Sequence, residues 1–129
     1  MNKKAYKVAR RAFGRFYSAT RTTMPWHRCL EYVIGERTVP DIGRVFVFKT
    51  IEDAKLFIGI NIYSYVIMEG IAENVGFPRF LCNFYNLDEI DCYWKLKDKK
   101  KKLKGAVSLD KAPNGTLSCS AFTPEKFVT

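Results

Sequence analysis

The feature that most constrains the fold is a junction at residues 43–57, where a short apolar run leads into an amphipathic segment. The run VFVF at 45–48 is β-branched and aromatic and too short for a helix, so it predicts a buried strand. Thr50 is then placed as an N-cap, and Glu52 and Asp53 occupy the first turn, where the helix dipole favours acidic side chains. The junction therefore predicts a helix over about 50–59. Its apolar face would consist of Ile51, Ala54, Leu56, Phe57 and Ile58.

The rest of the chain is mostly extended in pattern. Further strands are predicted at 4–10, 14–19, 29–34, 63–73 and 117–122, with a bulge at Gly70. We therefore expect a single α+β domain over residues 1–129, in which one principal helix packs on a mainly antiparallel sheet. A short second helix is predicted at about 87–94, followed by a lysine-rich loop at about 95–104.

No segment of the sequence has the pattern of a membrane span. The longest apolar candidate, at 56–68, is interrupted by Gly59, Asn61 and Ser64. The basic N-terminus lacks the apolar stretch that follows it in a signal peptide. These patterns predict a cytoplasmic protein that has no membrane partner.

Positive charge is concentrated in two blocks. The net charge is +9, residues 1–30 hold eight basic and no acidic residues, and residues 95–104 hold seven lysines and one aspartate. Such asymmetry favours a polyanion or an acidic protein surface as partner, although a lysine run can equally be a solvated loop. The candidate contacts are Arg10, Arg11, Arg15, Lys95, Lys97, Lys99, Lys100, Lys101, Lys102 and Lys104.

Aromatic residues are interleaved with the first basic block. Exposed aromatics in this hairpin could stack bases of single-stranded RNA or DNA while arginines hold phosphates. Alternatively, Tyr6, Val8, Phe16 and Ser18 face inward and the basic residues face water.

The cysteines and the single histidine give no metal or cofactor motif. Cys29, Cys82, Cys92 and Cys119 contain no Cys-x-x-Cys pair, and a site built on His27 and Cys29 would lack a close ligand pair at its other end. We therefore predict reduced thiols, no metal, no cofactor and no catalytic residues.

The first half of the chain carries a resemblance. The matching residues are Tyr6-Lys7-Val8, Arg10, Gly14, Ser18-Ala19, Leu30, Tyr32, Gly35, Pro40, Gly43, Phe46-Val47-Phe48, Glu52, Ala54 and Phe57. Their spacing resembles a family of small uncharacterised proteins of phages, archaeal viruses and their hosts. The resemblance implies an accessory protein of viral or mobile-element origin that binds a host partner and counters host defence. The family supplies no catalytic residues.

A looser similarity concerns ADP-ribosyltransferase-like domains. The strand at 45–48 and the capped helix with Glu52, Ala54 and Phe57 look like a strand and helix of those NAD-using enzymes. This similarity implies an early arginine or histidine, a central serine or tyrosine, and a late glutamate. The corresponding residues here would be Arg10 or His27, Tyr63 or Ser64, and Glu69 or Glu73.

Overall fold

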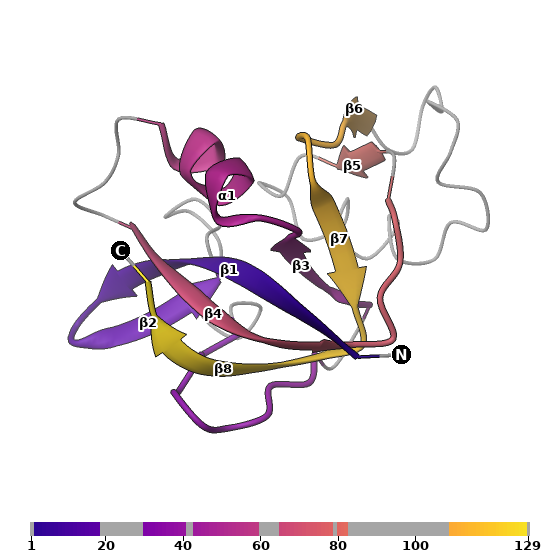
Figure 1. Ribbon diagram of the computed structural model, residues 1–129. Helices are drawn as coiled ribbons and strands as arrows, with labels where there is room; N and C mark the ends of the chain where they lie inside the picture. Colours follow the sequence, from indigo (N-terminus) through magenta and orange to yellow (C-terminus); the bar gives the residue numbers. More distant parts are fainter. Residues whose placement is uncertain are drawn as a thin grey trace.

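A six-stranded antiparallel sheet with β1 at its centre is the frame of the molecule (Figure 1). The computed structural model describes residues 2–18, 30–40, 43–59, 65–78, 80–82 and 109–128. Its elements are β1 (Lys3–Ala12), β2 (Arg15–Ser18), β3 (Val45–Phe48), α1 (Ile51–Ile58), β4 (Tyr65–Glu73), β5 (Phe80–Cys82), β6 (Leu109–Lys111), β7 (Thr116–Cys119) and β8 (Ala121–Phe127). β5 and β6 form a separate two-stranded sheet. The predicted combination of an antiparallel sheet and one main helix is confirmed for these residues.

β1 has strand partners on both edges. One edge pairs with β4 from Lys3 to Arg10, and β4 pairs in turn with β8. The other edge is shared, because Tyr6 pairs with Phe48 of β3 and residues 9–12 pair with β2. β3 extends the sheet further by pairing with β7.

Residues 30–40 connect the free edges of β2 and β8. The backbone of Tyr32 donates to Phe16 of β2 at 2.8 Å, and the backbones of Thr38 and Phe122 exchange two hydrogen bonds. β1, β4, β8, this segment and β2 thus form a closed ring of hydrogen-bonded backbone. The predicted strand at 29–34 is wrong in the described part, because a turn with Gly35 at φ 87° moves the chain from β2 to β8.

Both faces of the middle of β1 are buried. On the face of β1 that is turned toward the inside of the closed backbone ring, Ala5 and Ala9 pack with Met68 and Phe122. On the opposite side, Val8 packs with Ala54, Ile58 and Ile67, so α1 covers that face (Figure 1). A strand covered on both faces does not show the simple alternation of a half-exposed strand.

α1 confirms most of the predicted junction. The Thr50 Oγ1 accepts a hydrogen bond from the Asp53 amide at 3.1 Å, as an N-cap does. The apolar face is narrower than predicted, because Leu56 is 76% exposed and Phe57 is also exposed. Among the described residues, no helix has the length and apolarity that crossing a bilayer would need.

The C-terminal strands differ from the prediction in one respect. The bulge at Gly70 is confirmed by a register shift between Glu69 and Gly70 in the β4–β8 pairing. The single strand predicted at 117–122 is wrong, because the chain breaks at Ser120 into β7 and β8. The predicted helix at 87–94 and the loop at 95–104 lie outside the described residues.

Candidate anion-binding surfaces

The hairpin formed by β1 and β2 carries three of the predicted contact residues. Arg10 pairs with Tyr17 and Arg11 pairs with Phe16, and neighbouring residues of a strand point to opposite faces. The guanidinium carbon of Arg11 lies 5.9 Å from the centre of the Phe16 ring. Arg10 is half-buried on the α1 face. The two arginines therefore lie on opposite faces of the hairpin, with Arg11 exposed and Arg10 half-buried.

Phe13 and Gly14 form the two-residue loop of this hairpin. Both have positive φ, 53° and 74°, which is typical of a type I′ turn. Asn, Asp and Gly are the residues that adopt this conformation most easily, whereas a bulky side chain is disfavoured there. The Phe13 side chain is nonetheless kept at the tip, where it is 90% exposed. We will call residues 10–17 the basic hairpin.

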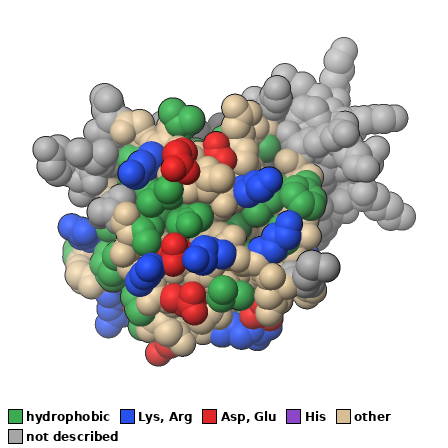
Figure 2. All heavy atoms as spheres, viewed as in Figure 1, with side chains coloured by type: hydrophobic (Ala, Val, Ile, Leu, Met, Phe, Trp, Pro, Cys, Tyr) green, Lys and Arg blue, Asp and Glu red, His purple; other side chains and the backbone are tan. Residues whose placement is uncertain are grey.

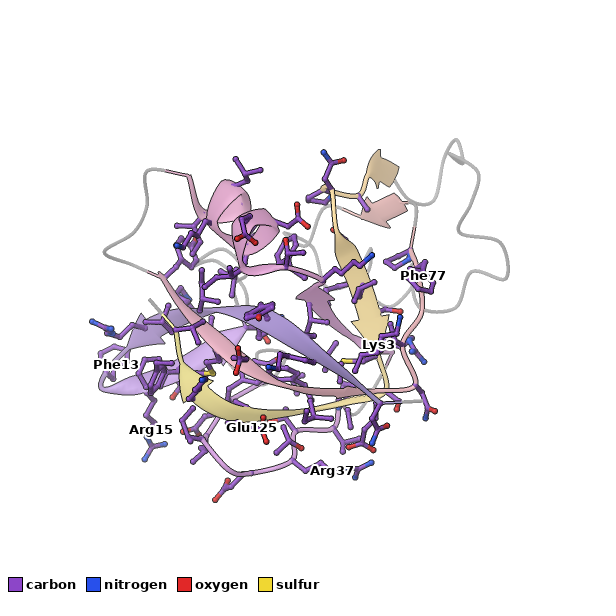
Figure 3. All side chains as sticks on the ribbon, in the orientation of Figure 1. Lys3, Phe13, Arg15, Arg37, Phe77 and Glu125 are labelled. Atoms are coloured by element: carbon purple, nitrogen blue, oxygen red, sulfur yellow. The ribbon has the colours of Figure 1, made fainter. Side chains whose placement is uncertain are left out.

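Arg15 lies just past the tip and reaches a carboxylate. Its Nη1 is 3.8 Å from an oxygen of Glu31, and its side chain is 65% exposed. Figure 3 shows Phe13 and Arg15 together at one end of the molecule. The seven predicted lysines, Lys95, Lys97, Lys99, Lys100, Lys101, Lys102 and Lys104, lie outside the described residues.

A cleft of about 650 Å³ lies at the other end of β1. It is lined by Lys3, Arg44, Asn74, Val75, Gly76 and Phe77. Phe77 is 71% exposed, and the Lys3 ammonium is 5.6 Å from the centre of its ring. Figure 3 shows these two side chains beside each other, opposite the end that carries Phe13. Sequence reasoning missed this cleft, because its residues come from three separate segments.

Hydrogen bonds fix the wall of the cleft. Arg44 donates from Nε to the Ser118 Oγ at 2.9 Å and from Nη2 to the carbonyl oxygens of Ser118 and Asn74. The backbones of Gly76 and Ser118 exchange hydrogen bonds of 2.7 and 2.9 Å. All these partners are neutral. Among the described residues, neither Arg44 nor Lys3 forms an ion pair, so both positive charges at the cleft lack a carboxylate within that part of the chain.

Lys7 does not face water, although the sequence pattern placed the basic residues outside. It is 8% exposed, and its Nζ donates to the Phe46 carbonyl at 2.8 Å and lies 5.4 Å from the centre of the Tyr32 ring. Its neighbours on this face, Ala5 and Ala9, are small and leave room for the aliphatic stem. Burial lowers the pKa of Lys7 to about 8 and raises that of the Cys119 thiol to about 11.

The two glutamates considered for transferase chemistry are held by basic side chains. Glu69 accepts from the Tyr6 hydroxyl at 3.2 Å and lies 3.5 Å from Lys126. Glu73 accepts two hydrogen bonds from Arg37, at 2.8 and 3.0 Å, and this pairing lowers the pKa of Glu73. His27, Tyr63 and Ser64 lie outside the described residues.

The described part of the chain contains no group of three His, Cys, Asp or Glu residues arranged to hold a metal ion. Cys119 is a free, buried thiol. On the face shown in Figure 2, basic and acidic side chains are interspersed, so the described residues form no continuous basic patch on that side.

Comparison of the chain with protein-family models, with curated proteins and with solved structures finds no match.

Proposed function

We propose that this protein is a non-enzymatic binding protein that holds single-stranded nucleic acid on the basic hairpin. Bases would stack on Phe13, and Arg11 and Arg15 would contact the flanking phosphates. No cofactor is required for this function, and a viral or mobile-element accessory protein could perform it in the host cytoplasm.

The conformation of Phe13 is the observation that carries the proposal. A bulky aromatic residue at positive φ is strained, and the Phe13 side chain is 90% exposed rather than buried in the core. Strain kept at one exposed residue points to a function for that side chain. A phenyl ring between two arginines supplies both of the contacts that single-stranded nucleic acid requires.

An acidic surface of a host protein is the second candidate partner. Arg15 already forms an ion pair with the carboxylate of Glu31, which is the kind of contact that an acidic protein surface would make. Aromatic and arginine side chains are also enriched among the residues that dominate protein interfaces. In this alternative, inhibition of a host defence protein would follow from covering that acidic surface.

The test compares Phe13→Asn with the wild-type protein, using fluorescence anisotropy of labelled oligo(dT) and oligo(U) of about 15 nucleotides. Asn suits the turn, so we expect the fold to gain up to about 1 kcal/mol while nucleic-acid affinity falls roughly five- to hundredfold. Arg11→Gln and Arg15→Gln should each reduce the salt dependence of binding by about one ion.

Leu56→Gln is the matched control, because Leu56 is an exposed apolar residue on α1. It should leave binding unchanged. Absence of binding by the wild type at low salt, or full affinity in Phe13→Asn, would contradict the nucleic-acid proposal. Capture of a host protein that Phe13→Asn releases would then favour the second candidate.

A further inference from the structure

We propose that the cleft at the start of β1 is a binding site for a nucleotide unit, either a free nucleotide or one nucleotide of a single strand. The base would stack on Phe77, and its phosphate would lie between Lys3 and Arg44. This site does not depend on the basic hairpin, which is at the opposite end of β1.

The first argument is the composition of the cleft. It is a depression of about 650 Å³ that opens broadly to solvent. It combines one exposed ring with two cations, and the described residues provide no carboxylate to neutralise either cation. A ligand that is aromatic at one end and anionic at the other matches this arrangement, and a nucleotide has both parts.

The second argument is that the cleft is preformed. Asn74 adopts a φ of 51°, and its side-chain amide donates to the Ser120 Oγ at 3.1 Å. Together with the paired backbones of Gly76 and Ser118, this fixes the turn that presents Phe77. A ligand that binds to a fixed wall does not have to order it, so more of the contact energy appears as affinity.

Arg44 gives the third argument, because its charge is held in one position. Its three hydrogen bonds go to a hydroxyl and two carbonyl oxygens, and these orient the guanidinium without neutralising it. Gly76 allows the Ser118 hydroxyl to pack closely against this wall, since a Cβ there would lie 2.9 Å from the Ser118 Oγ and 3.7 Å from the Arg44 Nη2. An oriented guanidinium at a cleft wall is suited to a phosphate oxygen.

The experiment titrates the full chain at low salt with AMP, UMP, adenosine and inorganic phosphate, and follows binding by calorimetry and by the aromatic proton signals of the protein. We expect saturable binding of AMP or UMP, and weaker binding of adenosine and of phosphate alone. Phe77→Ala should weaken nucleotide binding roughly five- to hundredfold, Lys3→Gln should weaken it less, and Phe77→Trp should retain it. Phe13→Asn should leave it unchanged.

A second arm uses a 5′-phosphorylated oligonucleotide to identify the source. If the mononucleotide binds as tightly as the oligonucleotide, the ligand is a free nucleotide. If only the oligonucleotide binds and Phe77→Ala weakens it, the ligand is a strand. The proposal is overturned if neither binds, or if binding is insensitive to Phe77→Ala. Failure of the hairpin proposal can be distinguished from failure of the cleft proposal, because the first is measured with Phe13→Asn and the second with Phe77→Ala.

Discussion

The middle of β1 and its two ends place similar side chains in different environments. Lys3, Lys7 and Arg11 lie on one face of the strand, and each is 5.4 to 5.9 Å from the centre of an aromatic ring. Lys7 is buried at the centre of the ring of strands, whereas Lys3 and Arg11 are exposed. All three side chains thus contact an aromatic ring. Burial alone decides whether the positive charge destabilises the folded state or is available to a partner.

The largest effect is expected in the pH dependence of the free energy of unfolding, when Lys7→Met is compared with the wild type. The unfolded chain keeps a lysine pKa of 10.5, whereas the folded chain has about 8. Between these values the unfolded state binds more protons, so the free energy of unfolding rises with pH by an amount on the order of 3 kcal/mol. Lys7→Met should lack this rise, which urea denaturation of both proteins from pH 7 to 10 would measure.

Cys119 acts in the opposite direction above pH 9, and the comparison with Lys7→Met accounts for it. Its thiol pKa rises from 9.0 to about 11 on folding, so the unfolded chain loses this proton first and stability falls. The wild type should therefore gain stability from pH 8 to 9 and then level off. A constant difference between wild type and Lys7→Met over the whole range would show that the Lys7 ammonium is hydrated in the folded protein.

A smaller effect is expected for Gly76→Ala at the cleft end of β1. The added Cβ would lie 2.9 Å from the Ser118 Oγ, so the wall must shift, at a cost of about 1 to 2 kcal/mol by thermal or urea unfolding. Adding Ser118→Ala should recover part of this loss. Gly14→Ala, at the hairpin end, is the control, because nothing lies within 4 Å of its added Cβ and its cost comes from φ alone. If Gly76→Ala and Gly14→Ala lost the same free energy of unfolding, and Ser118→Ala recovered none of the loss in Gly76→Ala, the wall would not be tightly packed.

The smallest effects are expected for Lys3→Gln and Arg11→Gln. An exposed cation beside an aromatic ring contributes about 0.5 to 1 kcal/mol, so each variant should lose no more than that. Unfolding curves at neutral pH would measure both. If either variant lost as much free energy of unfolding as the pH effect expected for Lys7, burial would not be what distinguishes Lys7 from Lys3 and Arg11.

The sequence predicted the parts of the fold that local contacts determine. The cap by Thr50, the strand at 45–48 and the bulge at Gly70 each depend on a few consecutive residues, and all three are confirmed. The inward position of Lys7 was not predictable, because the middle of β1 is buried on both faces and alternation then no longer indicates which side chains face water. β8 was also missed in part, since Pro124 within a run argues against a strand.

The candidate sites show the same division. The three arginines of the basic hairpin follow from charge clustering in one short segment, although the opposite faces of Arg10 and Arg11 follow only from the strand pairing. The cleft depends on the juxtaposition of Lys3, Arg44 and Phe77, whose positions in the sequence are far apart. No local pattern encodes such a site. The role of the lysines at 95–104 stays a prediction.

The closed ring of strands has a consequence for the order of folding. β1 lies near the beginning of the chain, but its main partner β4 begins at Tyr65, and the ring closes through β8, which begins at Ala121. Contacts so distant in sequence are reached slowly, because long loops must close first. We therefore expect β1 and the side chain of Lys7 to stay accessible to chaperones and proteases during synthesis, until β8 has left the ribosome.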